Sequence, residues 1–150
     1  MNDAILIHGT AVAIDGEGIL LRGPSGAGKS DLALRLIDGG ARLIADDQVL
    51  LCRRGERVLA RAPAVIAGLV EIRGIGIVQV ETIAEAPLAL IADLVPADRI
   101  ERLPQRRTEP LFGIDITLIA LDAFAASAAA KLRLVRRALA AGALPTIIGC

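Results

Sequence analysis

The sequence predicts an α/β fold in which a mixed sheet, rich in hairpins, is accompanied by few helices. Three observations lead to this prediction. A P-loop motif at residues 23–30 stands between an apolar, strand-like run and a helical pattern. Short apolar runs flank turn residues at 11–21 and again at 49–60, as they do in β-hairpins. Helical periodicity is clear only after residue 30 and again near the end of the chain.

The composition is that of one domain with a substantial core. The chain has 150 residues, and we expect residues 1–150 to form a single domain. Lys and Arg number 17, as do Asp and Glu, so the net charge is zero and no nucleic-acid partner is expected. There is no Trp or Tyr, and the two Phe residues are Phe112 and Phe124, so platforms for base stacking are absent.

The lengths of the apolar runs, the start of the chain and the spacing of the two cysteines bear on the expected cellular location and on metal or redox chemistry. The longest apolar runs are strand-sized, well short of the roughly 20 residues that cross a membrane. No leader peptide opens the chain, so we expect a cytoplasmic protein without a membrane partner. Cys52 and Cys150 do not have the spacing of a metal site or a redox pair.

The first part of the chain predicts a strand, a hairpin and a helix. Residues 4–7 are apolar and precede His8. The runs 11–14 and 19–21 flank an Asp-Gly turn and predict a hairpin whose second arm leads into the P-loop. That differs from doubly wound P-loop proteins, in which a parallel crossover is expected. The helix that follows the P-loop should end at Gly39.

The P-loop predicts a site for a nucleotide triphosphate. Its glycines allow backbone angles that turn successive N–H groups toward phosphate oxygens, and the helix N-terminus adds a partial positive charge. Lys29 should reach the β- and γ-phosphates, and the Ser30 hydroxyl should ligate Mg²⁺. The motif alone does not say how the phosphate is used. The residues expected to hold the nucleotide are Gly23, Pro24, Ser25, Gly26, Ala27, Gly28, Lys29 and Ser30.

Two adjacent carboxylates, Asp46 and Asp47, end the strand predicted at 42–45. We expect residues 49–52 to continue this strand and residues 58–60 to return as the second arm of a hairpin. Paired carboxylates in a buried setting are unfavourable unless a metal or a proton offsets their repulsion, and Mg²⁺ beside the phosphates would do so. One could hold the metal shell while the other accepts a proton from an attacking hydroxyl. The alternative is a strand-end turn in solvent.

Charged and glycine positions alternate with Ile at residues 71–78, which predicts a segment that is half strand and half loop. Glu71 could complete a Mg²⁺ shell, and Arg73 could neutralise charge on a transferring phosphoryl group. The alternative is an exposed ion pair on a surface strand. His8 is the one histidine, and a packed or capping role is the alternative to catalysis there.

The last part of the chain predicts two strands and a helix. Residues 88–95 form a buried strand, 96–110 a polar, Pro-bearing surface loop, and 114–119 an alternating strand. Ser127 should cap a final helix that runs to about residue 141. Three of its residues are expected to face inward: Leu132, Val135 and Leu139. Its basic residues are expected to lie mostly on a solvated face: Lys131, Arg133, Arg136 and Arg137.

Four segments taken together resemble the HPr kinase/phosphorylase family. They are residues 7–9, 23–30, 43–47 and 71–77, and the last looks like the signature segment of that family. The resemblance implies a P-loop kinase core similar to that of phosphoenolpyruvate carboxykinase. It also implies an ATP- and Mg²⁺-dependent protein-serine kinase. Its partner would be HPr, the phosphocarrier of the sugar phosphotransferase system, which accepts the phosphoryl group on a seryl hydroxyl.

The resemblance also assigns roles to residues. Asp47 would be the general base with Asp46 supporting it, and Lys29 would hold the phosphates. His8 would lie close to the phosphates, and Arg73 would belong to the catalytic segment. The implied catalytic residues are therefore Asp47, Asp46, Lys29, His8 and Arg73, and the implied metal ligands are Ser30 and Glu71.

Two departures from the longer family members limit what the resemblance implies. The chain starts directly at the kinase core, as in the short alphaproteobacterial form that lacks the additional N-terminal domain. Longer members carry a catalytic arginine in a late loop, whereas residues 121–127 contain none and Lys131 is only a loose candidate. The phosphorylase reaction is therefore left outside the prediction. A homo-oligomer is expected, and family members are often hexamers.

Two other functions stay open on the sequence. One is a small-molecule P-loop kinase in which the paired carboxylates serve a different hydroxyl. The other is a nucleotide-dependent regulatory module that binds a partner and hydrolyses slowly. The segment at residues 71–77 argues against both.

Overall fold

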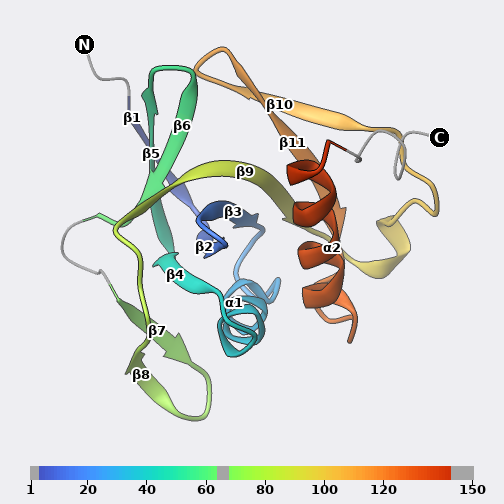
Figure 1. The fold of residues 1–150 in the computed structure, drawn as a ribbon. Coiled ribbons are helices and arrows are strands. Elements are labelled where there is room, and N and C mark those ends of the chain that lie inside the picture. Colours follow the sequence, from blue (N-terminus) through green and yellow to red (C-terminus); the bar gives the residue numbers. More distant parts are fainter. Residues whose placement is uncertain (1–3, 64–67, 143–150) are drawn as a thin grey trace.

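The computed structural model describes residues 4–63 and 68–142, in which strands of a curved sheet lie beside two α-helices (Figure 1). The helices are α1 (Lys29–Asp38), α2 (Ala128–Ala140) and the short 3₁₀ helix η1 (Ala97–Arg99). The strands are β1 (Ala4–His8), β2 (Thr10–Ile14), β3 (Glu17–Arg22), β4 (Arg42–Ala45), β5 (Gln48–Arg54), β6 (Arg57–Arg61), β7 (Leu69–Ile72), β8 (Gly76–Gln79), β9 (Glu85–Leu94), β10 (Arg107–Leu111) and β11 (Ile114–Leu121).

The main sheet is mixed and branches at β9. Its strands follow the order β1-β5-β6-β9-β3-β2-β4, and the β10–β11 hairpin joins β9 through β11. The start of β9 pairs antiparallel with β6, whereas its later part pairs in parallel with both β3 and β11. β7 and β8 form a separate two-stranded hairpin. The predicted fold of a mixed, hairpin-rich sheet with few helices is confirmed.

The strand that leads into the P-loop is the second arm of a hairpin, as predicted. β2 and β3 pair antiparallel around a two-residue turn, in which Asp15 and Gly16 both have positive φ angles of 50° and 80°. Such a turn matches the right-handed twist of the flanking strands. β3 then runs parallel to β9, so the carboxyl ends of these two strands lie at the same edge of the sheet.

Two buried clusters pack on opposite faces of β2 and β3, because successive side chains of a strand point to opposite faces. Val12, Ile19 and Leu21 pack with α1 and α2. Ala11 and Leu20 pack in the second cluster, with side chains of β5, β6 and β9. Each fully buried Leu or Ile stabilises the fold by about 1.5–3 kcal/mol, so both faces of the P-loop strand are fixed by packing.

Residues 49–52 continue the direction of the strand at 42–45, as predicted, after a bend at Asp46 and Asp47: β4 and β5 pair antiparallel with the consecutive strands β2 and β1. Asp47 has a φ angle of 69°, in the left-handed region, and the Gln48 N–H donates to the carbonyl oxygen of Asp46 at 2.8 Å. β4 lies beside β2, and after the bend β5 lies between β1, the strand that precedes β2, and β6. The apolar pattern is the same on both sides of the bend, and therefore it predicted the continued strand but not the bend itself.

The prediction of a surface loop over residues 96–110 is wrong at its end. Arg107–Leu111 form β10, which pairs antiparallel with β11. Its Pro110 lies opposite Asp115. Proline is tolerated on edge strands because no N–H is needed on the open side, so its presence did not exclude a strand here.

The final helix matches the prediction in its extent but not in all its contacts. Leu132 is buried, and Val135 and Leu139 are partly buried against the same cluster. Ser127 occupies the N-cap position, as predicted, but its side chain makes no capping hydrogen bond. Arg136 is buried rather than solvated, and Arg133 donates to the carbonyl oxygens of Arg35 and Leu36 at the end of α1 at 3.2 and 3.4 Å.

Cys52 lies within β5 as a partly buried free thiol, whereas Cys150 is outside the described residues. Within residues 4–63 and 68–142, neither α-helix has the length and apolar character that a membrane crossing requires.

Candidate active site

The P-loop leaves the carboxyl end of β3 and ends at the first turn of α1. Gly26 and Gly28 have φ angles of 85° and 95°, which side chains rarely adopt. A Cβ at Gly23 would come within 2.9 Å of the Ala27 Cβ, so the loop also needs a glycine there for close packing. Within the described chain, no side chain caps the N-terminus of α1, and its first N–H groups remain available for an anion.

Lys29 is held inside the loop. Its side chain is only 8% exposed, and its Nζ atom donates to the carbonyl oxygens of Gly23 at 2.6 Å and Pro24 at 3.0 Å. A buried ammonium needs such acceptors, because desolvation without partners disfavours the charged form. The loop therefore holds a positive charge next to the free N–H groups of the helix, which suits a polyphosphate.

Ser30 and Asp46 meet on the other side of the helix N-terminus. The Ser30 hydroxyl donates to Asp46 Oδ1 at 2.9 Å, and the hydroxyl of the fully buried Thr10 donates to the same oxygen at 2.8 Å. Two hydroxyl donors fix the direction of this carboxylate. A hydroxyl and a carboxylate oxygen are hard oxygen ligands of the kind that Mg²⁺ takes in proteins, with phosphate oxygens and water filling the remaining positions.

His8 and Asp47 form a second, more open pair. Their Nδ1 and Oδ1 atoms are 3.4 Å apart, and the two side chains are 54% and 71% exposed. The Gly9 N–H donates to the carbonyl oxygen of Asp47 at 3.0 Å, which fixes the turn that presents the carboxylate. Asp46 and Asp47 thus point into different environments: one toward the P-loop serine, the other toward solvent and His8.

Glu71 and Arg73 lie on the β7–β8 hairpin, away from these contacts. Val70 and Ile72 pack against the cluster around α1, so the intervening Glu71 projects to the exposed face of the strand. In the part of the chain that the structure describes, no hydrogen bond or ion pair links Glu71 or Arg73 to the P-loop. Within the same residues, no group of three or more His, Cys, Asp or Glu side chains forms a metal cluster.

Sequence reasoning missed a charged cluster directly before the P-loop. Arg22 pairs with Asp93 through Nε at 2.7 Å and with Glu109 through Nη1 at 2.6 Å. These bonds raise the pKa of Arg22, chiefly through Glu109 and then Asp93, and the Arg22 bond lowers the pKa of Glu109. Arg22 and Asp93 are register partners at the ends of the parallel strands β3 and β9. Only a correct prediction of this strand pairing would have revealed the cluster from the sequence.

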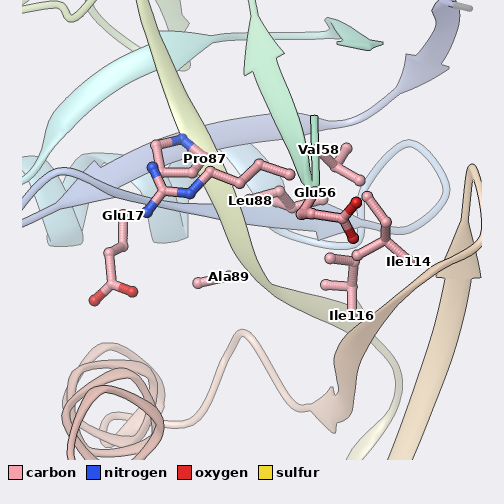
Figure 2. A pocket seen from close by; sticks show the side chains of 9 residues that line it. Glu17, Glu56, Val58, Pro87, Leu88, Ala89, Ile114 and Ile116 are labelled. Atoms are coloured by element: carbon pink, nitrogen blue, oxygen red, sulfur yellow. The ribbon is translucent and has the colours of Figure 1, made fainter. Parts of the chain in front are cut away.

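A cavity of about 280 Å³ lies elsewhere, between β6, β9 and β11 (Figure 2). Its walls include Glu17, Val58, Leu88 and Ile116. Glu17 and Leu88 belong to the amino ends of β3 and β9, whereas the P-loop follows the carboxyl end of β3. The cavity is therefore separate from the P-loop site, which is an open surface at the other end of the sheet.

The fold and the site together define a mixed-sheet P-loop protein, in which a hairpin strand leads into the loop and a neighbouring strand supplies the paired carboxylates. Residues 1–131 match the family described as HPr Serine kinase C-terminal domain. Because this match covers most of the 150 residues, the chain belongs to that family. The family resemblance predicted from the sequence is confirmed.

Known proteins similar to this chain agree with the assignment. The HPr kinase/phosphorylase of Bordetella pertussis is 38% identical over 128 residues, covering 77% of this chain and 42% of that protein. That of Limosilactobacillus reuteri is 42% identical over 103 residues, covering 68% and 31%. The chain thus spans less than half the length of these curated relatives. The structure of the HPr(Ser) kinase/phosphatase from Coxiella burnetii superposes with a TM-score of 0.77 at 27% identity, covering 97% of this chain and 93% of that one.

Proposed function

We propose that this chain is the catalytic domain of a cytoplasmic serine kinase that uses ATP and Mg²⁺ to phosphorylate HPr. The observation that supports the proposal is the Ser30–Asp46 hydrogen bond of 2.9 Å beside the P-loop, because a hydroxyl and a carboxylate, both groups that can bind Mg²⁺, then lie next to the expected phosphates. Family membership supplies HPr as the acceptor. We further propose that residues 1–150 act as one domain, and that copies of it associate as a homo-oligomer.

In this proposal the P-loop residues bind and orient the triphosphate. The N–H groups at the start of α1 and the Lys29 ammonium contact the phosphate oxygens, and the Gly23 and Pro24 carbonyls keep that ammonium in the loop. Ser30 and Asp46 would hold Mg²⁺, which neutralises charge on the phosphates when it is bound. Thr10 keeps the Asp46 carboxylate in position.

Asp47 is proposed as the general base. Its carboxylate is exposed and lies beside His8, so a seryl hydroxyl of a partner protein can approach it from solvent. Asp47 accepts the hydroxyl proton as the seryl oxygen forms a bond to the γ-phosphorus and the bond to the β–γ bridging oxygen breaks, leaving ADP. His8 orients the carboxylate from 3.4 Å.

The roles of Glu71 and Arg73 are proposed from the family motif alone. The motif gives Glu71 to the metal and Arg73 to the developing negative charge. Both lie on the hairpin that packs against α1 through Val70, so they are on the same side of the sheet as the helix that follows the P-loop.

The proposal is tested by phosphoryl transfer from γ-labelled ATP with Mg²⁺ to HPr, with an HPr whose acceptor serine is replaced by alanine as control. We expect label on the wild-type HPr alone. Asp47→Asn should lower the rate at least about 100-fold, because a general base contributes roughly 10²–10⁴. Retained activity in Asp47→Asn would remove the base assignment. Absence of transfer with ATP still bound would leave the nucleotide site and discard HPr as acceptor.

The reverse reaction can be tested on the labelled product of the same assay. Inorganic phosphate in excess would release the label as pyrophosphate if the chain also has phosphorylase activity. Residues 121–127 carry no arginine, so we leave this half-reaction outside the proposal.

A further inference from the structure

The loop between β11 and α2, residues 122–127, lies directly against the P-loop. A Cβ placed on Gly28 would come within 3.0 Å of the Ala123 Cβ and within 3.4 Å of two ring carbons of Phe124. Gly28 is the residue that precedes Lys29 at the start of α1. The phenyl ring of Phe124 therefore sits beside the backbone that is expected to bind phosphate.

The loop is fixed in this position from α1 itself. The guanidinium of Arg35 donates to the carbonyl oxygens of Ala123 and Ala125, the latter at 3.3 Å. The Phe124 N–H donates to Asp122 Oδ1 at 3.0 Å and the Ala125 N–H to the carbonyl oxygen of Asp122 at 3.2 Å, so the backbone at Phe124 is held in a turn. One helix thus begins with the P-loop lysine and, less than two turns later, holds the loop that carries Phe124.

The ring of Phe124 is nevertheless open to solvent. Phe124 is 71% exposed, whereas the neighbouring Ala123 is 1% exposed. The other phenylalanine, Phe112, is partly buried against the second core cluster. An aromatic ring that is held in place by its loop and open to solvent is a suitable surface for stacking. Leaving this ring exposed does not stabilise the free protein, because burial of its apolar surface would be favourable.

The topology places this face where the rest of a nucleotide would extend. β3, β9 and β11 run parallel, so the loops after β3 and β11 emerge at the same edge of the sheet. Ligands of parallel sheets bind at the carboxyl ends of the strands. A nucleotide held by its phosphates in the loop after β3 can lay its base along this edge toward the loop after β11.

We propose that Phe124 is the platform on which the base of the bound nucleotide stacks, and that it makes the site prefer a nucleoside triphosphate over inorganic polyphosphate. The inference rests on the proposed nucleotide site and adds to it a residue that sets specificity. It also changes the expectation that base-stacking platforms are absent, because tertiary folding brings one of the two Phe residues to the P-loop.

The test compares ATP with inorganic tripolyphosphate, which shares the phosphates but has no base. Calorimetry with Mg²⁺ should show that Phe124→Ala binds ATP about tenfold more weakly and tripolyphosphate within about twofold of wild type. Phe124→Leu should also lose ATP affinity, because it keeps an apolar contact but not the ring. Leu134→Ala removes another exposed apolar side chain, on α2, and should change neither affinity.

A direct readout is available because the chain has no Trp or Tyr. In Phe124→Trp the new indole is the sole tryptophan, and its fluorescence should change on addition of ATP but not of tripolyphosphate. Equal loss of both ligands in Phe124→Ala would mean that the ring only supports the P-loop, and would overturn the proposal. So would unchanged ATP affinity. A wild-type chain that binds neither ligand would instead refute the nucleotide site, and the platform with it.

Discussion

Asp46 and Asp47 are neighbours in the sequence but differ in every contact they make. Asp46 receives two hydroxyl hydrogen bonds next to the P-loop, and Asp47 stands exposed beside His8. The difference arises from the backbone, because Asp47 takes a left-handed φ angle of 69°. Asp is one of the few residues with a side chain that tolerate this conformation. In the proposed mechanism, this turn would divide metal binding and proton transfer between two adjacent carboxylates.

Asp46→Asn should weaken the response to Mg²⁺ more than the response to HPr. An amide is a neutral and weaker metal ligand than a carboxylate, so we expect the Mg²⁺ concentration for half-maximal activity to rise about tenfold. The KM for HPr should change by less than about twofold. Steady-state kinetics over a Mg²⁺ titration checks this, with the exposed Asp115→Asn as control. An unchanged titration would exclude Asp46 from the metal site.

At the scale of elements, Arg136 adds ion pairs to the packing of α2 against the β2–β3 hairpin. Arg136 donates to Glu17 at 2.8 Å and to Asp15 at 2.9 Å, and its own side chain is 9% exposed. The hairpin that it holds is the one whose second arm leads into the P-loop. The position of the final helix and that of the P-loop strand are therefore coupled through two ion pairs.

Arg136→Ala should lower the free energy of unfolding by about 2 kcal/mol, since two charged hydrogen bonds and a buried side chain are lost while both carboxylates regain water. Arg137→Ala, at the adjacent exposed position, should change it by less than about 0.5 kcal/mol. Urea denaturation of the two variants gives the comparison. Equal losses of stability in the two variants would show that neither the ion pairs nor the burial of Arg136 stabilises the fold.

At the scale of the whole molecule, Arg22 connects the branches of the sheet. It lies at the end of β3 and pairs with Asp93 on β9 and Glu109 on β10. β10 reaches the main sheet through β11, so this cluster ties the outer hairpin to the strand that precedes the P-loop. Its bonds hold the carboxyl edge of the sheet together at the site.

The Glu109 interaction should make stability depend on pH in acid. The hydrogen bond from Arg22 lowers the pKa of Glu109 below its usual value of 4.5. The stabilisation that this ion pair gives to the folded state is therefore complete above pH 4.5, and it is lost as the pH falls through the lowered pKa of Glu109 in the folded state. Glu109→Gln should therefore be less stable than wild type at pH 7, by about 1 kcal/mol, and the difference in stability should narrow as the pH falls below 4.5. Thermal melts from pH 7 to pH 3 test this, with the exposed Glu101→Gln as control. A constant difference across that range would contradict the assignment.

The sequence determined the elements that depend on near neighbours. Apolar runs and turn residues were enough to predict the P-loop, its hairpin strand, the helix after it and the strand before Asp46. They also predicted that residues 49–52 continue the strand at 42–45, but not the bend at Asp46 and Asp47, because that bend is a local change of backbone conformation between two apolar runs. They also failed at β10, where an edge strand carries proline.

Tertiary structure alone decided which distant residues meet. The bonds of Arg22 to Asp93 and of Arg136 to Glu17 join positions 71 and 119 residues apart, and the Gly28–Phe124 contact likewise spans most of the chain. Periodicity reports whether a side chain faces a core or solvent, but it does not say which element lies opposite. The P-loop and the paired carboxylates could therefore be recognised in the sequence, whereas the residues that surround and position them depend on how distant strands and loops meet in space.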